Sequence, residues 1–329
     1  MNSAKSASKD WRGAFHPRRE LGRTGFRATI LGIGDLADRK VPLDRCVATI
    51  HRAMDAGLNL IDTAPNYEDG YSEQIVGAAL KGHRHGMFVI DKIDNHHEPV
   101  APQVDASLKN TGLDTVDCFV FHGVSTTDDW RKIAAPGGGM EQLASAVKAG
   151  KARFRGISSH HPDVLLAAIP SGLCDVVMFA VGPFVHKRYV EEILPLAKKH
   201  RVGTVCFKTF GAGKLLADTT GYNQPLQTRP RGKFSSGGSD ASNAPTLPRL
   251  TVTECLHYTL TLDPDVALLG LSFPNEQDGA YAAAQSFRPL PPNQLSETRR
   301  RAVEAIQDKG PCWWNPPDHA HHLKEAEKP

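Results

Sequence analysis

The sequence predicts an α/β protein in which eight parallel strands, with helices between them, form a single (β/α)8 TIM barrel. Eight short apolar runs of strand length recur along the chain, and segments with apolar residues three and four positions apart separate them. Parallel strands need a crossover connection, and a helix is the usual one. An open, doubly wound sheet shares this alternation, but the count of eight favours the closed barrel.

The elements follow one another regularly from a predicted hairpin at 20–27. The strand-like runs span 29–34, 58–62, 87–91, 116–122, 152–159, 174–179, 203–207 and 266–272. Helical periodicity is clearest at 43–57, 72–82, 101–112, 138–150 and 188–200. Several of these segments end in Gly, which readily adopts the left-handed conformation that closes a helix. We expect a last helix at 293–309.

The chain divides into an N-terminal extension (1–18), the barrel (19–310) and a Pro- and His-rich tail (311–329). Within the barrel, 211–248 has no apolar periodicity and is rich in Gly, Ser, Pro and Asn. We expect a long loop there, and loops of this length are usually either functional or disordered. Its basic residues either reach a ligand phosphate or are solvated, and solvation is favoured for these residues: Arg229, Arg231 and Lys233. Solvation is also favoured over metal binding for the tail histidines His319, His321 and His322.

The composition excludes a wholly disordered, collagen-like or coiled-coil chain. The chain has 40% hydrophobic and 23% charged residues, as a folded domain does. Its net charge of +3 is too small to indicate a nucleic-acid or membrane partner. No apolar run approaches the ~20 residues of a membrane span, and no signal-peptide pattern is seen, so we expect a cytoplasmic protein. The six cysteines form no CxxC pair, which favours free thiols and no metal centre.

Polar residues with complementary chemistry follow the second, third and fourth strands, and we expect them to surround one mouth of the barrel. They are Asp62, Tyr67, Lys92 and His122. Lys92 beside Tyr67 would lower the pKa of the phenol, and Asp62 would hold Lys92 in place. The phenol then becomes a general acid, and His122 donates a hydrogen bond that orients a carbonyl oxygen. Each residue alone also fits a structural role, but their grouping favours catalysis of a hydride transfer from a cofactor.

These residues lie in segments that resemble the aldo-keto reductase superfamily. The resemblance runs from 20 to about 309 and includes "LGRTGFRATILGIG", "GLNLIDTAPNYEDGYSEQIVGAALKG", "GKARFRGISSHHPD" and "FKTFGAGKL". It implies a (β/α)8 barrel that reduces aldehydes and ketones with a nicotinamide cofactor. It also implies that Asp62, Tyr67, Lys92 and His122 are the catalytic tetrad.

The resemblance implies cofactor-binding positions as well, some of them altered. They are Ser158, Ser159, Phe207, Lys208, Gly270, Ser272 and Glu276. Ser159 and Met178 replace the Asn and Gln that usually hold the nicotinamide carboxamide. Phe207 either stacks on the nicotinamide ring or packs in the barrel. Glu276 stands where Arg or Gln is common and is either a helix-terminal acid or a residue that repels a 2′-phosphate, so NADH is slightly favoured over NADPH.

The leading hypothesis is an NAD(P)H-dependent oxidoreductase that acts on a small carbonyl or alcohol, with Tyr67 as general acid and base. An alternative is a catalytically weakened barrel that senses the nicotinamide or binds a partner. A metal-dependent hydrolase using His96/His97 or His160/His161 is disfavoured, because adjacent strand residues point in opposite directions. Asp35 either binds a polar or cationic substrate or caps a turn. The sequence predicts neither the substrate nor the oligomeric state.

Overall fold

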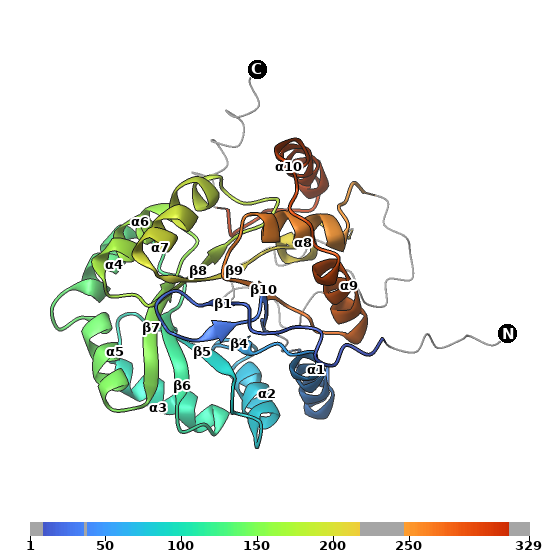
Figure 1. The fold of residues 1–329 in the computed structure, drawn as a ribbon. Helices are drawn as coiled ribbons and strands as arrows, with labels where there is room; N and C mark the ends of the chain where they lie inside the picture. The colour runs from blue at the N-terminus through green and yellow to red at the C-terminus, as the bar shows by residue number, and fades with distance from the viewer. Residues whose placement is uncertain (1–8, 36–37, 218–246, 316–329) are drawn as a thin grey trace.

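The computed structural model describes residues 9–35, 38–217 and 247–315. Eight parallel strands close into a barrel in the order β10-β3-β4-β5-β6-β7-β8-β9, with helices around it (Figure 1). The barrel strands are β3 (Leu31–Ile33), β4 (Leu60–Asp62), β5 (Phe88–Ile93), β6 (Val116–Phe121), β7 (Ala152–Ser158), β8 (Val176–Ala180), β9 (Gly203–Phe207) and β10 (Val266–Leu269). Every strand overlaps the apolar run that predicts it, so the predicted fold class is confirmed.

The helices that follow the strands bury their apolar sides against the barrel. They are α1 (Leu43–Asp55), α2 (Tyr71–Leu80), α3 (Val100–Thr111), α4 (Thr127–Ala134), α5 (Gly139–Lys148), α6 (Pro162–Ala168), α7 (Leu194–His200), α8 (Val252–Thr261), α9 (Pro274–Gln285) and α10 (Pro292–Ile306). Two helices, α4 and α5, follow β6, where the periodicity indicates one at 138–150. A π-helical turn, η2 (Tyr189–Ile193), leads into α7, and short 3₁₀ turns are η1 (Ile169–Ser171) and η3 (Gly211–Gly213).

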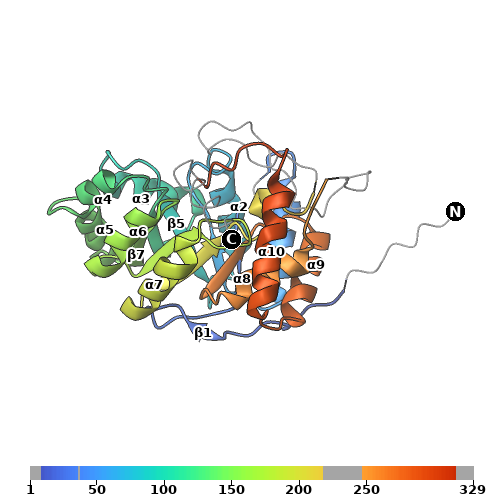
Figure 2. The same cartoon turned by 90° about the horizontal axis from the view of Figure 1, so that it is seen from above.

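A hairpin closes one end of the barrel, as the sequence predicts. Its strands β1 (Arg19–Glu20) and β2 (Arg27–Ala28) pair antiparallel, and the fully buried Leu21 joins the interior apolar cluster. Gly22 has a φ of +54°, and a Cβ there would lie 2.1 Å from the backbone nitrogen of Gly203. Only glycine permits this close packing of the hairpin on β9. Figure 2 shows β1 at one end of the barrel and the chain that follows α10 at the other.

Aromatic rings fill the barrel next to the hairpin. The ring centroid of Phe88 lies 5.0 Å from that of Phe26 and 5.9 Å from that of Phe154. Farther along the strands, apolar side chains such as Ile90 and Val120 continue the interior cluster. The hairpin end of the barrel is therefore packed, and the opposite end is left for polar side chains.

Residues on both sides of the predicted barrel segment also pack on it. In the N-terminal extension, Trp11 and Phe15 are buried and meet Tyr281 of α9 edge to face, with ring centroids 5.6 and 5.2 Å apart. In the predicted tail, Trp314 is fully buried. The division at residues 18 and 310 stays a prediction. The basic loop residues Arg229, Arg231 and Lys233 and the tail histidines His319, His321 and His322 lie outside the described residues.

Candidate active site

The candidate site lies where the barrel interior changes from apolar to polar. On β4, Leu60 belongs to the interior cluster and Asp62 lines a cavity, and on β5 Ile90 and Lys92 are related in the same way. Residues two apart on a strand share a face, so each strand places its last inward side chain at the mouth. The cavity holds about 1030 Å³ of empty space, part of it open to solvent. Its lining includes the predicted tetrad of Asp62, Tyr67, Lys92 and His122.

A buried ion pair joins Lys92 and Asp62 in the lining of the cavity. Lys92 Nζ lies 2.6 Å from Asp62 Oδ1 and donates a second hydrogen bond of 2.6 Å to the carbonyl oxygen of Thr63. Burial raises the pKa of Asp62 to about 6, although the charge of Lys92 opposes this rise. Burial alone would lower the pKa of Lys92, but Asp62 and then Tyr67 outweigh it and leave the pKa above its usual value. The ammonium is therefore held charged and fixed in position.

Tyr67 lies in the segment between β4 and α2 and faces this ammonium. Lys92 Nζ is 4.5 Å from the centroid of the phenol ring, and the ring of His122 is 5.5 Å away in an edge-to-face arrangement. Burial raises the pKa of Tyr67 above its usual value, while the charge of Lys92 and its hydrogen bond oppose the rise. The expectation of a lowered pKa is therefore wrong for the protein alone, because desolvation outweighs the ammonium. Tyr67 carries its proton at neutral pH.

His122 follows β6, and Asp94 determines which of its ring nitrogens carries the proton. His122 Nδ1 lies 2.5 Å from Asp94 Oδ1. Burial lowers the pKa of His122 despite this contact, so the imidazole is neutral at pH 7. A carboxylate accepts only, which assigns the proton to Nδ1 and leaves Nε2 as an acceptor. The expected donation from His122 to a carbonyl oxygen therefore requires the imidazolium form.

Asp94 was not among the predicted site residues, yet it joins two loops of the site. Its Oδ2 accepts a hydrogen bond of 2.9 Å from the backbone nitrogen of Asn66, the residue before Tyr67. Its Oδ1 contacts His122, so one carboxylate positions both the phenol segment and the imidazole. The sequence spacing does indicate this position, because Asp94 lies two residues after Lys92 and residues two apart on a strand share a face.

The residues expected at the nicotinamide carboxamide differ in their capacity to form a hydrogen bond with a ligand in the cavity. Ser158 lines the cavity, and its Oγ accepts a hydrogen bond of 2.8 Å from the backbone nitrogen of Gly123, so its hydroxyl proton remains available for donation. Ser159 is fully buried outside the cavity lining, and its Oγ donates 2.7 Å to the carbonyl oxygen of Val124. Met178 lines the cavity but has no strong hydrogen-bonding group. Ser158 alone of these three offers a hydrogen bond to a ligand there.

The remaining predicted cofactor residues separate into two groups. Phe207, Lys208 and Gly270 line the cavity. Ser272 and Glu276 lie outside its lining and bond to each other, since the backbone nitrogen of Ser272 donates 2.9 Å to Glu276 Oε2. Glu276 is buried in the first turn of α9, where a carboxylate interacts favourably with the helix dipole.

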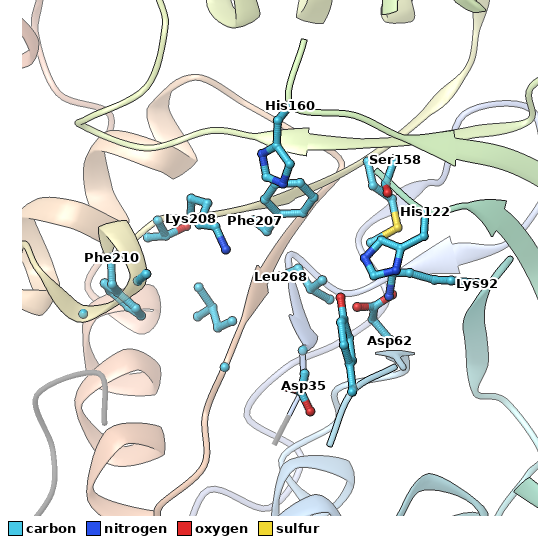
Figure 3. Close-up of a pocket in the computed structure, with 18 of the residues that line it drawn as sticks. Asp35, Asp62, Lys92, His122, Ser158, His160, Phe207, Lys208, Phe210 and Leu268 are labelled. Carbon is cyan, nitrogen blue, oxygen red and sulfur yellow. The ribbon is translucent and has the colours of Figure 1, made fainter. Parts of the chain in front are cut away.

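The cavity fits the nicotinamide end of a dinucleotide. Phe207 supplies an aromatic face, Ser158 a hydroxyl donor and Lys208 a cation, and all three share the cavity with Tyr67. Figure 3 shows Phe207 and Lys208 on the side of the cavity that faces His122, Lys92 and Asp62. A flat apolar ring with a polar substituent matches such a lining.

Two residues that the sequence does not place at the site also line the cavity. The sequence offers His160 only as half of a disfavoured metal pair and predicts Trp313 in the tail, whereas the structure places both at the cavity. Their ring centroids are 4.9 Å apart. The period of two places His160 on the face of Ser158, which was a usable signal. Trp313 had no local signal, because its position depends on contacts with distant segments.

Asp35 also lines the cavity, and its charge contributes to the raised pKa values of Asp62 and Tyr67. His96 Nε2 lies 2.8 Å from the carbonyl oxygen of His122. Across residues 9–35, 38–217 and 247–315, no three His, Cys, Asp or Glu side chains group as metal ligands. In the same ranges, no helix combines the length and apolarity of a membrane span.

Comparisons with known proteins agree on one family. The model of the Aldo/keto reductase family matches residues 29–264. The NADH-specific methylglyoxal reductase of Escherichia coli is 28% identical over 229 residues, which cover 61% of this chain and 69% of that protein. The holo form of aldo-keto reductase AKR11C1 from Bacillus halodurans superposes with a TM-score of 0.63 at 23% identity, over 88% of this chain and 96% of that one. An aldo-keto reductase from Klebsiella pneumoniae in complex with NADPH gives 0.62 at 18% identity, over 88% and 97%.

Proposed function

Because the chain belongs to the aldo/keto reductase family of nicotinamide-dependent oxidoreductases, we propose that it reduces a small aldehyde or ketone, or oxidises the corresponding alcohol, with Tyr67 as general acid and base. The observation that carries this proposal is the position of the Lys92 ammonium, 2.6 Å from Asp62 and 4.5 Å from the centroid of the Tyr67 ring. Asp62 and the carbonyl of Thr63 hold the ammonium beside the phenol.

In the reduction, Tyr67 donates its hydroxyl proton to the carbonyl oxygen of the substrate. The phenolate that remains is stabilised by Lys92, whose charge already opposes the burial that raises the pKa of the phenol. When bound, a reduced nicotinamide supplies the hydride. Phe207, Ser158 and Lys208 would hold its nicotinamide end, because they offer an aromatic face, a donor and a cation in the same cavity.

In the oxidation, the phenolate of Tyr67 takes the proton of the alcohol. Neutral His122, whose Nε2 only accepts while Asp94 holds the proton on Nδ1, would compete with Tyr67 for the single hydroxyl proton of the alcohol. In the reduction, a protonated His122 would donate to the carbonyl oxygen instead. Asp94 stabilises that cation through the same contact, so the imidazolium is the form of His122 that can donate to the reacting oxygen in both directions.

The test is Tyr67→Phe, assayed with a panel of small aldehydes that includes methylglyoxal, the substrate class in the name of the Escherichia coli relative. We expect turnover to fall by at least about 1000-fold, because the proton donor is lost, while the Kd for the cofactor stays within about twofold. Tyr189→Phe is the matched control, because the hydroxyl of Tyr189 is buried without a hydrogen-bond partner among the described residues. Unchanged turnover in Tyr67→Phe refutes the assignment.

We propose NADH rather than NADPH as the preferred cofactor. The carboxylate of Glu276, bonded to the backbone of Ser272, would repel a 2′-phosphate brought to the start of α9. One relative is named NADH-specific, whereas the structural neighbour from Klebsiella pneumoniae holds NADPH, so the family includes both. Titration of both cofactors by calorimetry should show the Kd ratio moving toward NADPH by about tenfold in Glu276→Gln. An unchanged ratio would remove Glu276 from the explanation.

The alternative of a catalytically weakened barrel that senses the cofactor has no observation in its favour. It differs from our proposal in one measurable outcome. A sensor would bind the nicotinamide yet reduce none of the aldehydes, and Tyr67→Phe would then change nothing.

A further inference from the structure

Two buried nitrogen atoms in the cavity lack hydrogen-bond partners. They are Nδ1 of His160 and Nε1 of Trp313, and neither finds a partner within the described chain. Both residues line the cavity of the proposed active site. A buried polar atom without a partner costs about 1–3 kcal/mol, so folded proteins rarely leave two such atoms together.

The two rings are packed firmly enough to form a specific site. The His160 ring meets Trp313 edge to face at 4.9 Å and lies 5.1 Å from Phe207. Figure 3 shows the His160 ring projecting into the cavity above Phe207, across from Asp62 and Lys92. Burial lowers the pKa of His160 well below its usual value, with the charge of Lys208 adding to the effect, so the ring is neutral.

Trp313 is held in place from both sides, although it lies after the last helix. On one side, Lys214 Nζ donates hydrogen bonds to the carbonyl oxygens of Lys309, Gly310 and Pro311. On the other side, Trp314 is fully buried, and its Nε1 lies 3.4 Å from the carbonyl oxygen of Phe184. The indole of Trp313 is thereby fixed beside the cavity before any ligand arrives.

The donors and acceptors of the pair indicate the chemistry of its ligand. Trp313 Nε1 can only donate, so it requires an acceptor. A neutral His160 donates from one ring nitrogen and accepts on the other, so its Nδ1 has either role. A hydroxyl group satisfies both atoms at once, because its oxygen accepts and its proton donates. An alkyl group satisfies neither.

We propose that His160 and Trp313 form a subsite that binds a hydroxyl group of the substrate, so that the enzyme selects hydroxyaldehydes and hydroxyketones over alkyl analogues of the same size. This inference rests on the proposed carbonyl reduction and names its substrate class. Tyr67, supported by Lys92, acts on the carbonyl oxygen, and the subsite in the same cavity binds a hydroxyl oxygen of the substrate. Selectivity is high in such a case, because the alkyl analogue leaves buried polar groups without partners.

The test compares isosteric substrates in the unmodified enzyme. Glycolaldehyde and propanal differ by a hydroxyl in place of a methyl group, as do 3-hydroxybutanal and 3-methylbutanal. We expect kcat/KM to be at least about tenfold higher for the hydroxylated member of one or both pairs, the value of one hydrogen bond. A ratio near one in both pairs, or a preference for the alkyl members, overturns the proposal.

Two variants connect the preference to these residues. His160→Phe and Trp313→Phe keep an aromatic ring and remove the nitrogen. We expect each to lower the hydroxyl preference about tenfold, while kcat/KM for propanal and the Kd for the cofactor by calorimetry stay within about twofold. A loss of cofactor binding with an unchanged preference assigns the subsite to the cofactor and overturns the proposal.

A binding measurement separates failure of this proposal from failure of the proposed function. If no aldehyde is reduced, ligand-observed NMR can still measure binding at the subsite, as the Kd values of hydroxyacetone and butanone. A tighter Kd for hydroxyacetone that is lost in His160→Phe supports the subsite without turnover. Equal Kd values for the two ketones overturn it.

Discussion

Asp94 Oδ1 lies 2.5 Å from His122 Nδ1, and the other oxygen of the same carboxylate accepts the backbone N–H of Asn66, next to Tyr67. Asp94 is therefore a positioning residue for two parts of the candidate site. It orients the imidazole and holds the segment that carries the phenol. The proton on Nδ1 makes Nε2 an acceptor while the ring is neutral.

Removal of Asp94 should lower both the activity and the pKa of His122. The hydrogen bond with Asp94 raises this pKa against burial, so Asp94→Leu should lower it further. We expect kcat to fall about 10- to 100-fold with little change in cofactor Kd, as when an orienting partner is lost. An NMR titration of His122 measures the pKa, and Asp94→Asn, which can still accept from Nδ1, should recover part of kcat. A lower kcat with an unmoved pKa would indicate a structural defect only.

Activity should decline as the pH falls through about 6. Burial raises the pKa of Asp62 to about 6, so this carboxylate becomes protonated at a pH where an exposed one stays charged. Its protonation removes the partner of Lys92, and kcat/KM should fall about tenfold per pH unit below that value. Burial lowers the pKa of His122, the other titrating group of the site, so the pH profile is also measured in Asp94→Leu. A fall in kcat/KM that persists near pH 6 in this variant belongs to Asp62, whereas a fall that moves to another pH contradicts the assignment to Asp62.

Asp91→Asn should stabilise the protein, and more so at high pH. Burial, followed by the charge of Glu73, raises the pKa of Asp91 well above its usual value. A carboxyl group with a raised folded-state pKa favours folding at low pH and loses that contribution as the pH rises through its folded-state pKa. The amide has no charge to bury, so we expect a gain of about 1–2 kcal/mol in the free energy of unfolding at pH 8 and less at pH 5. Urea denaturation at both values checks this.

Lys214→Met should loosen the segment that carries Trp313. The substitution removes hydrogen bonds to three carbonyl oxygens, while Lys309 Nζ would still donate to the carbonyl oxygens of Lys214 and Pro248. We expect faster hydrogen exchange in residues 309–315 and a loss of about 1–3 kcal/mol in stability. Lys198→Met is the control, because its ion pair with Asp263 is half exposed and contributes little. Equal effects of the two substitutions would contradict this role for Lys214.

The sequence predicts those parts of the molecule that depend on local periodicity. Strand positions follow from apolar runs, and Lys92 and Asp62 meet because each is the last inward residue of its strand. The alternation of inward and outward side chains along a strand also predicts that Ser159 points outward and that Asp94 lies near Lys92. It could not show that burial outweighs the effect of Lys92 on the pKa of Tyr67, because that balance depends on the whole surrounding structure.

The position of Trp313, in contrast, could not be predicted from the sequence. Nothing near it in the chain indicates an inward position, because the contacts that place it come from Lys214 and Phe184, about 100 or more residues earlier. A composition rich in Pro and His is typical of a solvated terminus, so the sequence predicts that Trp313 lies in the tail. Long-range hydrogen bonds to backbone carbonyls leave no pattern in sequence, since any residue presents the same carbonyl.

The bonds from Lys214 to residues 309–311 have a consequence for biosynthesis. Because they join segments 95 to 97 residues apart, one wall of the cavity is assembled only after residues 309–311 have left the ribosome. A nascent chain halted after α10 would contain all eight strands yet lack the indole. Such a truncated product should resist proteolysis as a barrel while discriminating poorly among its substrates.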